Sequence, residues 1–241
     1  MRNRVVLLTG WGMSPATLAP LAAALHGLDE RLQVEVLPLP EVDSAEPARW
    51  LDALEACVPT DTWLAGWSLG GMLAAELAAR RGDHCCGLIT LASNTCFVAR
   101  EDWPHAMPSA TFEAFLASCR ADGSATLKRF AMLCAQGAQE PRPLARALSA
   151  GIAAEAGSVQ GLEVLAALDT RAALQGFNGP QLHLFADADA LVPAEAAGEL
   201  LACLADVEVG LLEGASHAFP VEEPHAVAAS IHGFLQEARD D

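Results

Sequence analysis

Ser68 stands in a sequence setting that could turn its hydroxyl into a nucleophile. It belongs to the segment G-W-S-L-G-G at residues 66–71, which matches the pattern G-x-S-x-G. The segment falls between residues 62–66, which are expected to form a strand, and residues 69–81, which are expected to form a helix. A serine on so sharp a turn needs neighbours without bulky side chains, and the flanking glycines meet that need. The alternative is a glycine-rich turn with an incidental serine, because so short a pattern also arises by chance.

A serine hydroxyl is a poor nucleophile unless a base accepts its proton, so a histidine is required. His217 is the candidate, because its segment E-G-A-S-H-A-F-P at residues 213–220 directly follows the last expected strand, residues 207–212. A loop at that point can carry the imidazole over the edge of a sheet. The remaining histidines are expected at the surface or in satisfied core positions; they are His26, His84, His105, His183, His225 and His232.

Asp189 is the candidate for the acid that orients this imidazole. The segment F-A-D-A-D-A-L-V-P at residues 185–193 follows the strand expected at residues 181–186. Serine, acid and histidine then occur along the chain in the order found in α/β-hydrolases. Asp189 heads D-A-L-V-P at the tip of the loop, ahead of a helix that a proline begins, whereas Asp187 is expected to cap the turn. Asp189 is therefore favoured, and Asp187 is the alternative.

Stabilising the anion formed on a carbonyl oxygen needs two hydrogen-bond donors. One is expected to be the backbone N–H of Leu69, the residue after the serine, at the start of a helix whose dipole favours a developing anion. The other is expected from the loop after the first strand, where Trp11 lies in the segment T-G-W-G at residues 9–12. An ordinary tight turn would also explain the two glycines of that loop.

The elements that must position these groups alternate along the chain as in a parallel sheet with helical crossovers. Strands are expected at residues 4–9, 32–37, 62–66, 86–92, 181–186 and 207–212, and helices at residues 15–26, 46–57, 69–81, 193–204 and 222–238. Between residues 98 and 168 the sequence shows only helical segments punctuated by proline and glycine. The predicted fold is an α/β-hydrolase: a mostly parallel six-stranded sheet with helices on both faces and a helical cap inserted after the fourth strand. The core would be residues 1–97 and 169–241, and the cap residues 98–168, in one domain with an insertion.

Composition narrows the class of protein further. The 241 residues suffice for one domain with an insertion, and an apolar content of 52% excludes disorder of the whole chain. A net charge of −17 argues against nucleic-acid binding, which needs clustered cations. No apolar run is long enough to span a membrane, and residues 1–10 lack the apolar core of a secretory signal.

The seven cysteines include no C-x-x-C pair, so we expect reduced, mostly buried thiols in a cytoplasmic protein. Cys85 and Cys86 are adjacent and could instead form a redox or metal pair. No histidine or cysteine lies at ligand spacing from them, so we favour the interpretation that both are reduced thiols. No metal or other cofactor is expected.

Nearly the whole chain resembles the pimeloyl-[acyl-carrier protein] methyl ester carboxylesterases of biotin synthesis. The motifs that carry the resemblance, in addition to the serine and histidine segments, are G-W-G at residues 10–12, L-A-S-N-T-C-F-V-A-R-E-D-W-P at residues 91–104, G-L-E-V-L-A-A-L-D-T-R at residues 161–171 and D-A-L-V-P at residues 189–193. Two departures from the family are Thr9, where the family usually has histidine, and P-L-P-E-V at residues 38–42, which replaces a G-x-G-x-S passage.

The resemblance implies a role for each site residue. It makes Ser68 the nucleophile, Asp189 the acid and His217 the base, with Trp11 and Leu69 contacting the substrate carbonyl. The segment R-F-A-M-L-C at residues 129–134 matches the stretch that lines the family's acyl channel. The implied channel residues are Phe130, Ala131, Met132, Leu133 and Cys134. The implied reaction is hydrolysis of the methyl ester of pimeloyl-[acyl-carrier protein] methyl ester, without a cofactor.

Charge is distributed unevenly in a way that suits an acidic carrier protein as partner. Residues 120–150 hold five cations and two anions, a local net charge of +3, which leaves −20 on the rest of the chain. A basic island on an acidic protein offsets long-range repulsion and steers the encounter with an acidic partner. The docking candidates are Arg129, Arg142 and Arg146, and the alternative is that these are solvated charges that pair locally. We expect no membrane partner and a protein that acts as a monomer.

Two other functions remain compatible with this sequence. The same fold and catalytic residues could serve a broad-specificity hydrolase of small esters or lactones, since a fold does not determine the substrate. A non-catalytic carrier-binding protein could also keep the fold, although intact Ser68, Asp189 and His217 argue against it.

Overall fold

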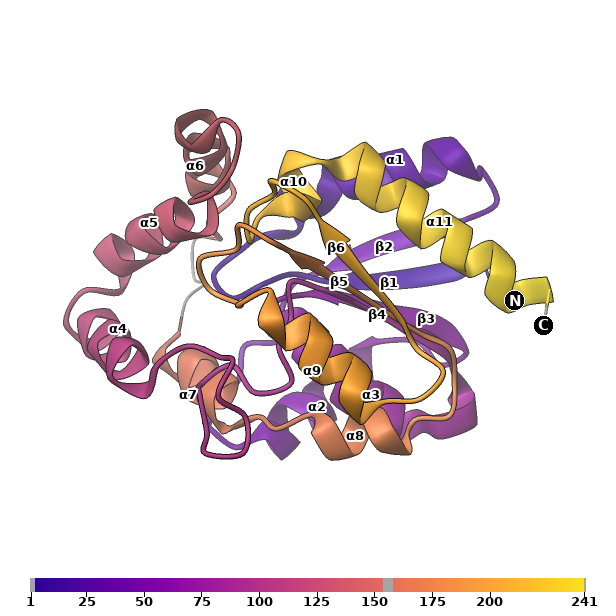
Figure 1. Cartoon of the computed structure of the whole chain (residues 1–241), viewed down its shortest axis with the longest axis horizontal. Helices are drawn as coiled ribbons and strands as arrows, with labels where there is room; N and C mark the ends of the chain where they lie inside the picture. The colour runs from indigo at the N-terminus through magenta and orange to yellow at the C-terminus, as the bar shows by residue number, and fades with distance from the viewer. Residues whose placement is uncertain (1–2, 154–157, 241) are drawn as a thin grey trace.

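The centre of the molecule is a six-stranded sheet with the strand order β2-β1-β3-β4-β5-β6, seen in a computed structural model that describes residues 3–153 and 158–240 (Figure 1). Every neighbouring pair of strands runs parallel, which confirms the predicted fold. The central strands are buried on both faces because helices cover both faces, and this explains their nearly continuous apolar sequences. The strands are β1 (Arg4–Leu8), β2 (Gln33–Leu37), β3 (Thr62–Trp67), β4 (Cys85–Leu91), β5 (Gln181–Ala186) and β6 (Glu208–Leu212).

Helices pack against both faces of the sheet, as Figure 1 shows. One face is covered by α1 (Ala19–Leu28) and α11 (Pro224–Asp240), and the other by α2 (Pro47–Cys57), α3 (Leu69–Arg81), α8 (Arg171–Gly176) and α9 (Glu195–Cys203). Helix α3 is buried nearly all round, because it lies between the sheet and the surrounding helices. None of the described helices is both long and apolar enough to cross a membrane.

Two helices expected to be continuous are interrupted at prolines. The first is a 3₁₀ turn, η1 (Pro15–Leu18), followed by α1, whose second residue is Pro20. The last is a short helix, α10 (Phe219–Glu222), followed by α11, which begins at Pro224. Proline has no backbone N–H to donate to the carbonyl four residues before it, so a continuous α-helix cannot pass through either position without a break.

The parallel register brings the carboxyl ends of five strands to one edge of the sheet. Aligned partners near this edge are Leu8 with Gly66, Trp67 with Leu91, Leu91 with Leu184 and Ala186 with Leu212. Each loop that leaves this edge carries one of the chemically interesting segments found in the sequence. Binding sites of parallel α/β sheets form at this edge because the loops there converge.

Most of the helices between β4 and β5 belong to an insertion that lies beyond this same edge, to the left in Figure 1. In the described part of this insertion they are α4 (Ser109–Ala121), α5 (Gly123–Cys134), α6 (Pro141–Ala150) and α7 (Val159–Ala167). Residues 154–157 of the expected cap lie outside the described residues. We propose that residues 98–168 act as a cap over a core formed by residues 1–97 and 169–241.

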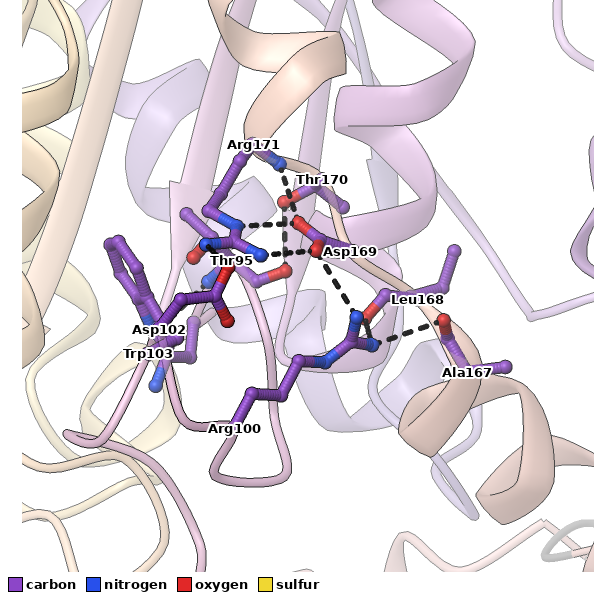
Figure 2. Close-up of polar contacts among 10 residues, drawn as sticks. Thr95, Arg100, Asp102, Trp103, Ala167, Leu168, Asp169, Thr170 and Arg171 are labelled. Atoms are coloured by element: carbon purple, nitrogen blue, oxygen red, sulfur yellow. Dashed lines mark hydrogen bonds and ion pairs between the residues drawn. The ribbon is translucent and has the colours of Figure 1, made fainter.

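A cluster of ion pairs joins the two segments that enter and leave this insertion (Figure 2). Asp169 accepts from Arg171 at 2.6 and 2.9 Å and from Arg100 at 3.1 Å. Arg171 also donates to Asp102 at 2.8 Å, and its guanidinium lies 5.6 Å from the ring centre of Trp103. Two motifs that are far apart in the sequence, residues 91–104 and 161–171, thus meet at one place, which we call the cap base.

Hydrogen bonds from Arg171 are the main reason why the pKa of Asp169 falls from its ordinary value of 3.8 to about 2. Because the folded-state pKa is below the unfolded one, the carboxylate stabilises the fold above about pH 4, and this contribution is lost as the pH falls toward about 2. The Asp169 side chain is 28% exposed, so solvent screens part of the effect.

Asp169→Asn is therefore expected to lower the free energy of unfolding at pH 7 by about 1–2 kcal/mol, after allowance for screening. The difference from wild type should shrink as the pH falls below about 4, because the wild-type carboxylate then takes up a proton too. Urea denaturation across this pH range measures both effects. Glu101→Gln, which makes the same charge change in the adjoining loop, serves as the control, and equal losses in the two variants would contradict the assignment.

Candidate active site

Ser68 lies in a strained backbone conformation at the junction of β3 and α3. Its φ is 55° and its ψ is −121°, in the left-handed half of conformational space that residues other than glycine rarely occupy. The main chain is held on both sides: the Ser68 N–H donates to the Leu91 carbonyl at 2.8 Å, and the Ser68 carbonyl accepts from the Ser93 hydroxyl at 2.8 Å. The amides of Gly71 and Met72 donate to the same carbonyl. These bonds keep the strained turn in place.

The first turn of α3 lies so close to β1 and β3 that side chains are excluded. A Cβ atom on Gly66 would collide with the backbone of Gly70, and a Cβ on Gly70 would collide with the Thr9 carbonyl. A Cβ on Gly71 would overlap the Ser93 hydroxyl, a requirement that the sequence motif did not reveal. Thr9, which departs from the family pattern, acts here through its main chain, since its N–H also donates to the Leu37 carbonyl at 3.1 Å.

Asp189 and His217 are joined by a hydrogen bond of 2.7 Å between Asp189 Oδ2 and His217 Nδ1. Their side chains are 1% and 0% exposed, so the pair is out of contact with water. The other oxygen, Oδ1, accepts from the backbone N–H groups of Leu191 at 2.7 Å and Val192 at 2.9 Å. A carboxylate can only accept, so the proton of a neutral imidazole sits on Nδ1. His217 Nε2 then presents its lone pair, and it is buried with no hydrogen-bond partner among the described residues.

Asp187 has a different partner from Asp189. Its Oδ1 accepts from the backbone N–H of Gly214 at 2.6 Å and so ties the loop after β5 to the loop after β6. The structure therefore brings Asp189, and not Asp187, to the imidazole. Asp187 and Asp189 are only two positions apart, but their side chains point to different partners, Gly214 and His217.

His217 is anchored next to the serine turn by Trp67. The indole Nε1 of Trp67 donates to the His217 carbonyl at 2.9 Å, and the centres of the two rings are 5.9 Å apart. Because Trp67 precedes Ser68, this bond holds the main chain of the histidine beside the neighbour of the serine. The anchor spans 150 positions of sequence, and the G-W-S motif gave no reason to expect it.

Leu69 and Trp11 are the two residues expected to donate backbone N–H groups to a carbonyl oxygen. Leu69 is the first residue of α3, where an N–H has no acceptor within the helix, and the helix dipole favours negative charge there. Trp11 lies in the loop after β1, and its buried side chain is held by a 3.0 Å hydrogen bond from Nε1 to the Ser158 carbonyl. Its ring packs edge-on against Phe130 at 5.1 Å and Phe115 at 5.8 Å.

An apolar cavity of about 50 Å³ lies between the cap and the loop that carries Asp189. Leu191, whose N–H donates to Asp189, forms part of its wall and so links the cavity to the loop of the acid. The other lining residues come from the cap and its entry segment: Phe97, Met107, Thr111, Phe112, Phe115, Phe130, Leu133, Leu162 and Leu165. Leu191 belongs to the D-A-L-V-P segment, but the sequence gave no indication that it lines a cavity.

Helical geometry separates the five consecutive cap residues expected in one channel. Phe130 and Leu133 line the cavity, whereas Ala131 and Cys134 are fully buried. Burial, together with the nearby charge of Asp189, raises the pKa of the Cys134 thiol. Met132 is 64% exposed, so the expectation that it lines the channel is corrected. With 3.6 residues per turn, five successive side chains cannot all point the same way.

A second hollow, of about 470 Å³, lies on the other side of Trp11. Trp11 lines it together with Gly10 and Gly12, and residues 38–43 form the opposite wall. Trp11 also contacts Phe115 and Phe130 through its ring, and these two residues line the apolar cavity. The loop at residues 38–43, where the sequence departs from the family pattern, therefore lines the same hollow as Trp11.

The three arginines proposed for docking lie on two neighbouring cap helices, Arg129 on α5 and Arg142 and Arg146 on α6, and all three are exposed. Arg129 donates to the Thr126 hydroxyl at 3.2 Å. Within the described ranges none of the three is held in an ion pair, whereas Arg120 pairs with Glu163 at 2.7 Å.

His183 occupies the satisfied core position expected for it. It is buried in β5, with Nδ1 2.7 Å from the Thr90 hydroxyl and Nε2 3.3 Å from Gln181 Oε1. Burial lowers its pKa to about 3, so the ring is neutral at physiological pH. Its hydrogen bonds serve the interior of the sheet.

A parallel sheet, a strained serine turn and an Asp–His pair on the loops after the fifth and sixth strands define an alpha/beta hydrolase. The profile of the Alpha/beta hydrolase family matches residues 5–230. Among solved structures, a bromoperoxidase from Bacillus anthracis has the same fold, with a TM-score of 0.82 at 21% identity, covering 98% of this chain and 92% of that one.

Curated relatives narrow the family further. A pimeloyl-[acyl-carrier protein] methyl ester esterase of Aromatoleum aromaticum is 33% identical, over 98% of this chain and 99% of that protein. A biotin biosynthesis bifunctional protein BioHC of Cellvibrio japonicus is 35% identical over 98% of this chain, but the chain spans only 48% of that longer protein. The chain belongs to the alpha/beta hydrolase family and, within it, to the pimeloyl-[acyl-carrier protein] methyl ester esterase family.

Asp189→Asn is expected to lower kcat/KM for a p-nitrophenyl ester by about a thousandfold or more, because an amide no longer favours the imidazole tautomer with a free Nε2. Asp187→Asn makes the same chemical change two residues away. Its amide oxygen still accepts from Gly214, so its kcat/KM should stay within about threefold of wild type. Steady-state kinetics on variants with unchanged circular dichroism measures both. A larger loss in the Asp187 variant would make that residue the acid.

Proposed function

We propose that this protein is a serine carboxylesterase that hydrolyses the methyl ester of pimeloyl-[acyl-carrier protein] methyl ester, in biotin biosynthesis, and needs no cofactor. The observation that carries the chemistry is the buried Asp189–His217 hydrogen bond, which leaves Nε2 as a base on the edge of the sheet where Ser68 lies. The assignment of the substrate is supported by the names of relatives that match this chain over nearly their whole length at 30–33% identity.

In the first half of the proposed reaction, the Ser68 hydroxyl attacks the carbonyl carbon of the methyl ester while His217 Nε2 accepts its proton. The negative charge that develops on the carbonyl oxygen is stabilised by the backbone N–H groups of Leu69 and Trp11. The tetrahedral intermediate collapses as the C–O bond to the methoxy group breaks. That oxygen takes the proton from Nε2 and leaves as methanol, which gives an acyl-enzyme on Ser68.

In the second half, His217 Nε2 accepts a proton from a water molecule that attacks the acyl carbonyl. The second tetrahedral intermediate collapses by breaking the bond to Ser68 Oγ, which regains its proton from the imidazole. The products are the free enzyme and a carboxylic acid that ionises in water. Throughout, the Asp189 carboxylate holds the ring in orientation and stabilises the imidazolium by a charge-assisted hydrogen bond.

The cap is proposed to hold the methylene chain of the substrate. The cavity lined by Phe130, Leu133 and Leu191 is apolar, which suits a chain of CH₂ groups, and Leu191 also donates its N–H to Asp189. Ala131 and Cys134 support this wall from the buried side of α5.

An acidic acyl carrier protein is proposed to dock on the outer face of α5 and α6, which we call the basic cap face. Arg129, Arg142 and Arg146 are exposed there without an ion pair among the described residues, so they are free to meet carboxylates. Met132, exposed on the same helix as Arg129, adds an apolar contact. Such a face steers the partner while the rest of the protein repels it.

The proposed compartment is the cytoplasm, where biosynthetic carrier proteins work and thiols stay reduced. None of the seven cysteines, all of which are described, forms a disulfide. Burial raises the pKa of Cys85 to about 11, so this member of the adjacent pair Cys85 and Cys86 has little thiolate at neutral pH.

Complementation tests the proposed function. The wild-type gene is expected to restore growth without biotin to a bacterial strain that lacks its own pimeloyl-carrier methyl ester esterase, and Ser68→Ala is expected to fail because no other group can form the acyl-enzyme. Immunoblots confirm equal expression. Purified wild type should also release methanol from the carrier-borne ester. Hydrolysis of short aryl esters without hydrolysis of the carrier-borne ester would instead indicate a broad-specificity esterase.

The combined replacement of Arg129, Arg142 and Arg146 by alanine is expected to raise KM for the carrier-borne ester about tenfold at low salt, because steering by several exposed charges is lost. Kinetics on a p-nitrophenyl ester should be unchanged. At high ionic strength wild type should approach the variant, since salt screens these charges. Arg49→Ala, on the exposed side of α2, is the control. A KM unaffected by the triple replacement would rule out this docking face.

A further inference from the structure

We propose that Glu222 is a positioning residue that fastens the loop carrying His217 to the end of the cap. This inference rests on the proposed role of His217 as the base. Glu222 ends α10, the short helix that follows the histidine, and its carboxylate reaches back along the chain. It accepts hydrogen bonds from two segments that are distant in sequence, one in the core and one in the cap.

On the core side, Glu222 holds Ser216, the residue directly before the histidine. Its Oε2 accepts from the Ser216 hydroxyl at 2.9 Å and from the Ser216 N–H at 3.2 Å. Ser216 is fully buried, and its hydroxyl oxygen in turn accepts from the Ala218 N–H at 3.3 Å. The carboxylate and the serine together therefore hold the main chain on both sides of His217.

On the cap side, Glu222 Oε1 accepts from the backbone N–H of Gln139 at 3.0 Å. Gln139 lies in the connection between α5 and α6, and a second bond close by runs from the Ala218 N–H to the Cys134 carbonyl at 3.1 Å. Gly137, in the same connection, has a φ of +95°, and a Cβ there would collide with the Ala188 carbonyl. The end of α5 thus rests against both loops that carry the Asp–His pair.

Only an acceptor with two oxygens suits this place. Three donors converge on the Glu222 side chain: the N–H and O–H of Ser216 and the N–H of Gln139. An ionised carboxylate offers both oxygens as acceptors, whereas a glutamine offers one oxygen and turns an NH₂ group toward another donor. A Glu222→Gln variant is nearly the same size as wild type and leaves at least one of these donors unpaired.

The main chain at His217 then depends on three anchors, which are Glu222 through Ser216, Trp67, and the end of α5 through Cys134. The Asp189 hydrogen bond sets the rotation of the ring, but the main-chain anchors set where the ring lies. Removing one anchor shifts the base relative to Ser68 without removing a group that reacts. Small displacements of catalytic groups have large effects on rate, up to about a hundredfold for 1 Å.

The test compares Glu222→Gln with Glu223→Gln, the same change at the next residue, whose side chain makes no hydrogen bond or ion pair with the described residues. For p-nitrophenyl acetate, we expect kcat of Glu222→Gln to fall about tenfold while KM stays within about twofold, because the base is displaced and binding is not. Labelling by a fluorophosphonate should slow in the same proportion. Glu223→Gln should match wild type in both measurements.

Ser216→Ala provides a second variant, which removes one donor and leaves the carboxylate in place. Its kcat should fall less than that of Glu222→Gln. The double variant should be no slower than Glu222→Gln alone, because both changes disrupt the same hydrogen-bonded contact between Glu222 and Ser216. Rates are expressed per active site titrated with the fluorophosphonate, so partial unfolding does not mimic the effect. If Glu222→Gln does not fold, a Ser216→Ala variant with wild-type kcat is enough to overturn the proposal.

The outcomes separate this proposal from the proposed function. A wild-type protein that neither hydrolyses the ester nor reacts with the fluorophosphonate overturns both, since His217 would not be acting as a base for Ser68. An active wild type with equal kcat in Glu222→Gln and Glu223→Gln overturns only the role of Glu222. A fall in melting temperature without a fall in kcat per active site would likewise make Glu222 structural and overturn its positioning role.

Discussion

The close approach of α3 to β1 and β3 is the constraint on which the rest of the structure depends. Glycine at positions 66, 70 and 71 lets the first turn of the helix lie against the backbone of its neighbours, where any Cβ would collide. That contact accompanies the strained conformation of Ser68 and places Leu69 at the start of the helix, where a backbone N–H has no acceptor within the helix. The proposed nucleophile and its oxyanion donor thus arise from one packing arrangement. The other loops only need to reach the same edge of the sheet.

Among the attachments between the cap and the core, two have different consequences for the active site. At the cap base, the cluster around Asp169 and Arg171 joins the entering and leaving segments by ion pairs on the partly exposed surface. At the end of α5, hydrogen bonds from Gln139 and Ala218 join the cap directly to the loop of His217. The first attachment supports the fold. The second places the cap and the base in one hydrogen-bonded unit, so the position of the cap bears on the position of the imidazole.

Much of the fold followed from patterns that act over a few residues. Apolar runs and the periodicity of helices predicted the strands and their alternation with helices, because each element must bury its apolar side chains. The helices wrongly predicted to be continuous were those with a proline inside the predicted range, Pro20 and Pro224. The periodicity of apolar residues does not show where a proline lacks the backbone N–H that a helix needs. Met132 was misplaced for a related reason, because a matched segment does not say which face of a helix each side chain takes.

The sequence by itself determined the turn around Ser68, the order of serine, acid and histidine along the chain, and the order of the strands and helices. Each of these depends on neighbours within a few positions. Only the tertiary structure decided that Asp189 and not Asp187 meets the imidazole, that Trp67 anchors His217, and that Glu222 bonds to Gln139. Those contacts join loops between 28 and 150 positions apart. The packing of the sheet sets their geometry, and no local pattern encodes it.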